Sequence, residues 1–346
     1  MGSNMLRKLI NIEKLTHSIK TAIAVAIGIL LPPLLGFHSS QWVVITIIVV
    51  MCAQIYVGSV LQKAFLRFLG TIIGCLFATS AILIADSHLS VLITICLSSF
   101  IFSYISSGEY SYSSSLGAVT TAIILLGQTP TIALAGERFL EISVGLLIAT
   151  MVSQFVLPIH ARTHLRRAQA ATLEQLRDYY QAAMIGNEPT VDYRDLEESI
   201  VSSLLKQRQL AKESRREPLG LEFNREHFLQ SLYCEREILR AITFMQSAST
   251  HISKSTFNFF QQPALIAFNQ MVVDALSTLM KVIDDQKPGE EPIYITGVAE
   301  LKEAIERNIN ISPREELLYI DGLLFSAESL ADSLKKLAVL YRVSVR

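Results

Sequence analysis

The sequence predicts an all-α, polytopic membrane protein in which six transmembrane helices are followed by a cytoplasmic helical bundle. Three observations support this fold class. The first 160 residues contain six apolar stretches, each near the length of about 20 residues that a helix needs to cross a bilayer. The rest of the chain is charged and amphipathic, with apolar positions recurring every three or four residues. Basic residues, finally, collect at alternate ends of the apolar stretches.

The six apolar stretches define the predicted domains. They lie at residues 19–37, 42–61, 66–85, 89–106, 112–130 and 138–158. The fifth is the least apolar, because it contains several serines and threonines. We therefore expect a cytoplasmic N-terminal segment at 1–18, a six-helix transmembrane domain at 19–160 and a cytoplasmic α-helical domain at 161–346.

The distribution of lysine and arginine predicts the topology. Basic residues precede the first stretch, lie between the second and third, and follow the sixth: Arg7, Lys8, Lys14, Lys20, Lys63, Arg67, Arg162, Arg166 and Arg167. The loops on the opposite side, at 36–41, 86–88 and 128–136, contain no lysine or arginine. Since basic loops stay in the cytoplasm, both termini of this multi-pass protein are expected there.

Beyond residue 160, the spacing of apolar residues predicts successive helices. They cover residues 165–183, 196–207, 222–253 and 263–283, and a long last helix ends near 341. Pro263 suits the first turn of its helix. Ser312, Pro313 and Glu315 are typical of a capping box at the start of the last helix. The apolar stripe of that helix is long enough to bind a bundle or a partner subunit.

Composition and motifs exclude several classes of function. The chain has no P-loop, no glycine-rich dinucleotide turn, no nucleophile elbow and no His/Cys metal spacing, so we expect neither an enzyme nor a cofactor or metal site. With a net charge of −1, nucleic acid is not an expected partner. Without a Walker motif, any transport would not be driven by ATP hydrolysis on this chain.

Ionisable residues within the apolar stretches are the candidates for a substrate pathway. Such groups are costly at membrane depth, so they usually face a cavity or a partner. Arg67 begins the third stretch, where it could contact an anion at the inner mouth. Glu137, Arg138 and Glu141 begin the sixth, and Arg138 can pair with Glu141. Two alternatives stay open: Arg67 as a topology anchor that reaches lipid phosphates, and Arg138–Glu141 as a structural ion pair near the interface.

Uncharged polar residues could line the same cavity. The candidates are Thr120 and Thr121 in the fifth stretch and Gln54 and Tyr56 in the second. Threonine hydroxyls in helices often bond back to their own backbone. An ordinary packing role is the alternative for Gln54 and Tyr56.

Small residues predict where helices pack closely. Gly70, Gly74 and Ala78 lie four residues apart, so they form one smooth stripe that lets another helix approach. In the sixth stretch, Gly145 lies four residues after Glu141 on the same face.

The segment that carries Arg67 resembles a known signature. It reads Lys-Ala-Phe-Leu-Arg-Phe-Leu-Gly-Thr-Ile-Ile-Gly from Lys63 to Gly74. This is similar to the Arg-x-x-Gly-Thr-x-x-Gly pattern of the fusaric acid resistance and aromatic acid exporter superfamily, which includes plant aluminium-activated malate transporters. Arg67, Gly70, Thr71 and Gly74 occupy the defined positions of that pattern.

The last apolar stretch is also similar to that family's last span. Arg138 is followed by Gly145, and the stretch ends at Pro158 before a basic exit. The resemblance implies a transporter or channel-like exporter of organic anions, typically aromatic carboxylates, across the bacterial inner membrane. Because many bacterial members contain two membrane blocks, it also implies a homodimer here, and a periplasmic adaptor is a possible partner.

One departure from the family concerns charge. Glu137 and Glu141 near the outer mouth would repel a carboxylate unless Arg138 neutralises them or they are protonated. The alternative function is a non-transporting membrane scaffold whose cytoplasmic helices bind a partner. A cavity that contains Arg67 or Arg138 would favour transport, and a bundle packed solid with apolar side chains would favour the scaffold.

Overall fold

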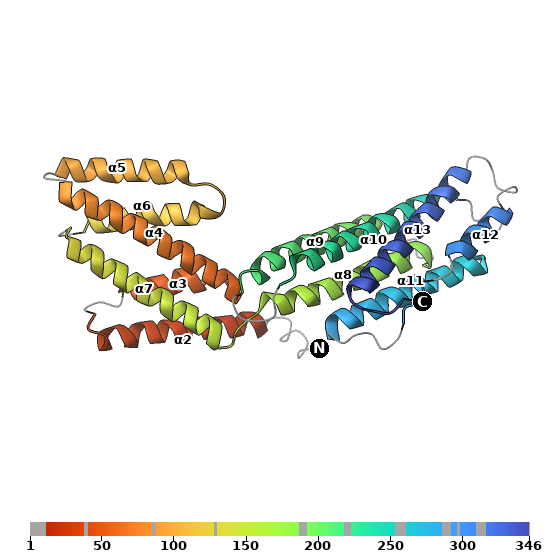
Figure 1. The fold of residues 1–346 in the computed structure, drawn as a ribbon, viewed down its shortest axis with the longest axis horizontal. Coiled ribbons are helices and arrows are strands. Elements are labelled where there is room, and N and C mark those ends of the chain that lie inside the picture. The colour runs from red at the N-terminus through yellow and green to blue at the C-terminus, as the bar shows by residue number, and fades with distance from the viewer. Residues whose placement is uncertain are drawn as a thin grey trace. The chain divides into compact units, whose positions relative to one another are not determined.

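The computed structural model shows an all-helical protein (Figure 1). It describes residues 12–37, 41–84, 88–127, 130–186, 192–217, 223–252, 261–285, 292–295, 298–308 and 316–345. Apart from a β-bridge between Ile293 and Val345, regular structure in these ranges is helical, as the sequence predicts. The chain forms two compact units. The membrane unit comprises Met1–Ala161 with Arg216–Gly220, and the C-terminal unit comprises Arg162–Arg215 with Leu221–Arg346.

The membrane unit is built around helix α4. Its elements are α2 (Ile12–Leu34), α3 (Gln41–Met51), α4 (Val57–Ile84), α5 (His88–Ile105), the short helix η1 (Gly108–Tyr110), α6 (Ser111–Leu125) and α7 (Ile132–Phe155). One apolar core joins α2, α3, α4 and α7, and a second joins α4, α6 and α7. Many large apolar side chains of this unit remain exposed on the outside, as lipid contact requires.

Three of the described helices are long and apolar enough to cross a membrane. They are Ile12–Leu34, Val57–Ile84 and Pro263–Asp284. The last of them belongs to α11 of the C-terminal unit, where Phe268, Val272 and Leu279 on its apolar stripe are buried. Together with the exposed apolar surface of the membrane unit, these helices identify a helical membrane protein.

The second and third predicted stretches, 42–61 and 66–85, form two separate helices, but the predicted break between them is wrong: the second helix is shorter and the third begins earlier. α3 ends at Met51, and the chain turns through Gln54 and Tyr56 before α4 begins at Val57. Lys63 therefore lies inside a helix and not in a loop. The charge pattern suggested a break there, but no glycine or proline between 59 and 69 interrupts the helix.

The C-terminal unit contains six helices in the described ranges. They are α8 (Ala161–Met184), α9 (Tyr193–Ser214), α10 (Arg225–His251), α11 (Pro263–Asp285), α12 (Val298–Asn308) and α13 (Leu317–Leu340). Pro263 begins its helix as predicted. α12 was not predicted from the sequence. Its residue Leu301 is fully buried. The capping box of Ser312, Pro313 and Glu315 lies outside the described residues.

Candidate anion-binding pocket in the membrane unit

Close helix packing positions the candidate site. A Cβ atom added at Gly74 of α4 would lie 2.6 Å from the Gly117 carbonyl oxygen and 2.7 Å from the Thr120 Cβ of α6. A Cβ at Gly70 of α4 would collide with the carbonyl oxygen of Ser113, which also belongs to α6. On the other side of the unit, a Cβ at Gly145 of α7 would lie 2.8 Å from the Val43 carbonyl oxygen of α3. Glycine is thus required for these two contacts.

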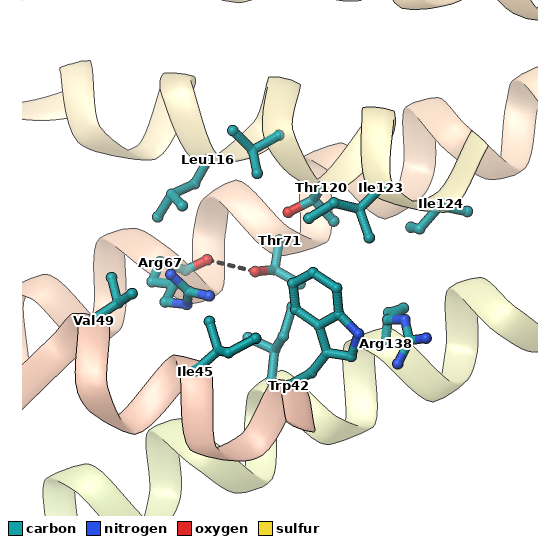
Figure 2. Close-up of a pocket in the computed structure, with 12 residues that line it drawn as sticks. Trp42, Ile45, Val49, Arg67, Thr71, Leu116, Thr120, Ile123, Ile124 and Arg138 are labelled. Carbon is teal, nitrogen blue, oxygen red and sulfur yellow. Dashed lines mark hydrogen bonds between the residues drawn. The ribbon is translucent and has the colours of Figure 1, made fainter. Parts of the chain in front are cut away.

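Between these contacts lies a cavity of about 240 Å³. Helices α3, α4, α6 and α7 all contribute to its wall (Figure 2). The wall is mainly aliphatic, with a few polar groups and two arginines. Its residues are Trp42, Ile45, Val49, Arg67, Thr71, Leu116, Val119, Thr120, Ile123, Ile124, Arg138 and Ile142. Ligand sites of drug-sized molecules span about 300–1,000 Å³, so this cavity suits a smaller molecule.

Arg67 is the buried cation of the pocket. Its side chain is only 6% exposed, which separates it from a topology anchor at the lipid surface. One guanidinium nitrogen donates to the Thr46 hydroxyl at 3.3 Å, while Nε has no hydrogen-bond partner. Among the described residues, no carboxylate pairs with Arg67. Thr71, one turn later on α4, donates its hydroxyl to the backbone carbonyl oxygen of Arg67 at 2.8 Å, as Figure 2 shows.

Arg138 differs from Arg67 because its charge is paired. Its guanidinium donates to the carboxylate of Glu141, which is buried at 4% exposure. The same guanidinium lies 5.2 Å from the centroid of the Trp42 ring, a cation–π contact. In the view of Figure 2, the indole lies between the two arginines. Two cations and one paired carboxylate leave the pocket with a net positive charge.

Of the other residues predicted to line a substrate pathway, some line the pocket and others lie outside it. Thr120 lines the pocket, while Thr121 donates to the backbone oxygens of Gly117 and Gly74 and does not line it. Glu137 is exposed and is not among the residues that line the pocket. Gln54 and Tyr56 are half-buried in the turn between α3 and α4.

Of the other residues predicted to pack helices together, two are buried at helix contacts and one is exposed. Ala78 is buried in the core that joins α4 to α6, and Gly145 is buried against α3. Pro158 is exposed beyond the end of α7.

Sequence reasoning missed Trp42 and Thr46. Trp42 is the one tryptophan of the chain, placed in an apolar stretch, and that rarity was the available signal. Thr46 is fully buried within a run of valine and isoleucine. Both lie on α3 and face α4 and α7, which is knowable only once these helices are packed together.

The structure is that of an all-helical membrane protein with two arginines at the wall of an interior pocket. The chain belongs to the fusaric acid resistance protein family, whose model matches residues 14–247. This match covers most of the membrane unit and part of the C-terminal unit.

Individual relatives agree with this membership. The chain is 27% identical over 175 residues to the inner membrane protein YeeA of Escherichia coli K12, covering 50% of this chain and 49% of that protein. It is 31% identical over 160 residues to the p-hydroxybenzoic acid efflux pump subunit AaeB of Escherichia coli O9:H4, covering 40% of this chain and 24% of that subunit. The chain thus matches about half the length of the first relative and about a quarter of the second.

Proposed function

We propose that this protein exports small organic anions with an apolar or aromatic body across the bacterial inner membrane. Arg67 is the observation that carries the proposal: a buried guanidinium without a carboxylate partner among the described residues, at the wall of a mainly aliphatic cavity. A carboxylate can accept a bidentate pair of hydrogen bonds from such a fork. The aliphatic wall and the Trp42 ring would contact the apolar body.

The charge balance supports an anionic cargo. Glu141 was expected to repel a carboxylate, but its ion pair with Arg138 removes that objection. Glu137, the other carboxylate expected there, is exposed and does not line the pocket. One relative is named for p-hydroxybenzoic acid, and an aromatic carboxylate of that size is the first ligand to test here.

Several features complete the proposed transporter. Six spans, with both termini and residues 162–346 in the cytoplasm, are part of the proposal and rest on the basic residues near the N-terminus and after the sixth apolar stretch. Transport is not driven by ATP hydrolysis on this chain, because the sequence has no Walker motif. A homodimer is the proposed complete unit, and a periplasmic adaptor is the proposed additional partner. The alternative function, a scaffold without transport, lacks a role for a charged cavity.

The single tryptophan provides a direct binding assay. Because Trp42 is the chain's one tryptophan and lies at the pocket wall, its fluorescence in the purified protein reports occupancy of that pocket. Titration with p-hydroxybenzoate should change this emission in a saturable way. Arg67→Gln should weaken binding by about 1–3 kcal/mol, roughly 5- to 150-fold, the scale of a hydrogen bond to a charged group.

Two further variants separate charge from geometry. Arg67→Lys should restore part of the affinity, because it returns the charge but not the planar fork. Lys14→Gln removes an exposed charge on α2 and should bind as the wild type does. In cells, Arg67→Gln should also lower efflux at limiting substrate with unchanged abundance. Wild-type efflux of a panel of organic acids by both Arg67→Gln and Arg138→Gln would refute the anion pathway and favour the scaffold.

A further inference from the structure

A groove in the C-terminal unit brings three arginines together. It lies between α9 and α10 and has a volume of about 310 Å³. Small-molecule sites span about 300–1,000 Å³, so the groove is large enough for a small ligand. Its wall consists of aliphatic residues and arginines: Val201, Leu204, Leu205, Arg208, Leu232, Arg236, Leu239 and Arg240. None of these lining residues is acidic, so the wall of the groove is positively charged.

Packing between α9 and α10 positions the arginines. The two helices lie side by side (Figure 1), and the Gln207 side chain of α9 donates to the buried Glu235 carboxylate of α10 at 2.6 Å. Arg208 and Arg236 are the next residues on their helices, so this buried contact holds their backbones at the two sides of the groove. Arg240 follows Arg236 by one turn and lies on the same face of α10.

Two of the three guanidiniums have no anionic partner. Arg240 is paired with Glu237, which lies three residues before it on α10. Arg208 and Arg236 form no hydrogen bond or ion pair with any other residue that the structure describes. Charges of one sign that line a concave surface raise the local concentration of counter-ions. The groove therefore attracts anions, and no carboxylate of its own wall competes for them.

Aliphatic side chains give the groove an apolar surface beside the arginines. Leu204, Leu232 and Leu239 form its buried base, while Val201 and Leu205 remain 43% and 59% exposed at its edge. An inorganic anion would leave this exposed edge in contact with water. An organic anion would cover it with a hydrocarbon body, while its carboxylate accepted paired hydrogen bonds from the guanidiniums. The groove thus favours a molecule with a carboxylate head and an apolar body.

We propose that the groove between α9 and α10 is a binding site for a small organic carboxylate, separate from the pocket in the membrane unit. Arg208 and Arg236 bind the carboxylate, and the aliphatic residues contact the hydrocarbon body. The site rests on its own lining residues and does not depend on the proposed function.

The test uses one reporter for each site in the full-length protein. In a background without native cysteines, Ser202→Cys carries an environment-sensitive fluorophore on the exposed face of α9, next to Val201, while Trp42 reports on the other pocket. Titration with p-hydroxybenzoate should change the fluorophore emission in a saturable way. Arg208→Gln/Arg236→Gln should raise the half-saturating concentration at the fluorophore by about tenfold and that at Trp42 by less than about twofold.

Two further variants separate the site from general charge and from folding. Lys206→Gln/Lys212→Gln removes the same number of positive charges from α9 outside the groove wall, and it should leave the titration unchanged. Arg208→Lys/Arg236→Lys should recover part of the affinity, because it restores the charges without the planar forks. Since all four substituted side chains are exposed, each variant should melt at the wild-type temperature.

Each outcome decides the inference. An unchanged fluorophore titration in Arg208→Gln/Arg236→Gln would refute the site, and so would equal weakening by Lys206→Gln/Lys212→Gln. Equal binding of inorganic phosphate, or of the uncharged p-hydroxybenzamide, would show that the groove does not recognise a carboxylate on an apolar body. A fluorophore response without a Trp42 response would support this site and count against the proposed function. The reverse would refute this site alone, and the absence of both responses would refute both proposals.

Discussion

The substitution Gly74→Ala tests whether the contact between α4 and α6 determines the shape of the pocket. Gly74 lies on α4 one turn after Gly70, and its missing side chain lets the α6 backbone approach. A Cβ there would lie 2.6 Å from a carbonyl oxygen and 2.7 Å from another Cβ, distances that real Cβ atoms do not adopt. Since the first of these atoms belongs to the backbone, no rotamer change relieves the clash. The helices must separate, at about 1–3 kcal/mol, the usual range for overpacking.

Gly136→Ala provides the matched control for the intrinsic preference of alanine over glycine in a helix. Gly136 lies within α7, and a Cβ at this position would meet no atom within 4 Å. This variant should gain roughly 0.5–1 kcal/mol from helix propensity. The difference between the two variants isolates the steric term, because both make the same chemical change.

The assay is the apparent melting temperature of the purified, detergent-solubilised protein, combined with the Trp42 titration. Gly74→Ala should melt below the wild type and Gly136→Ala at or above it. Since Thr120 lies opposite Gly74 and also lines the pocket, Gly74→Ala should in addition weaken ligand binding. A Gly74→Ala protein that melts with Gly136→Ala and binds normally would show that this contact is not tight.

Two further predictions concern topology and pH. In a background without native cysteines, Ser87→Cys should react with an impermeant thiol reagent in intact cells, while Ser202→Cys, exposed on α9, should react only after permeabilisation; the reverse pattern would invert the topology. Burial raises the pKa of the Glu235 carboxyl from its ordinary 4.5 to about 7, so the folded protein holds this proton more tightly than the unfolded chain. The stability contributed by this group should therefore fall by up to about 3 kcal/mol as pH rises from about 4.5 to 7. Glu235→Gln should flatten this part of the stability profile of the full chain, and an unchanged slope would assign the pH dependence to other groups.

The helical class could be predicted from the sequence because hydrophobic period and length are local properties. Pro263 marked the start of α11 because proline suits a first helical turn for reasons that need no tertiary contact. The interruption between α3 and α4 was misplaced, because charge was used to locate a loop. Lys63 and Arg67 lie inside α4, where Lys63 lies over the Tyr112 ring and Arg67 donates to the Thr46 hydroxyl. α12 was missed because eleven residues form too short a periodic pattern next to a turn.

The candidate site was predictable only in part. Glycines at spacing four identified the tight face of α4, because the absence of side chains is visible in the sequence. Whether Arg67 reached lipid or protein could not be decided, since both positions suit a residue at the start of an apolar stretch. Trp42 and Thr46 were missed because their relation to Arg138 and Arg67 exists only after α3 packs between α4 and α7.

The two arginines of the pocket have different partners, and this difference bears on the direction in which an anion would pass between them. Arg138 already has a carboxylate partner in Glu141 and an aromatic partner in Trp42, so a cargo anion must compete for it. Arg67 has a hydroxyl partner and an Nε without one, so under the proposed function it attracts an anion more strongly than Arg138 does. An anion held at Arg67 would pass to a site where Glu141 competes with it, and that competition favours release over retention. Glu141→Gln should therefore increase affinity in the Trp42 titration, and a loss of affinity would contradict this assignment of roles.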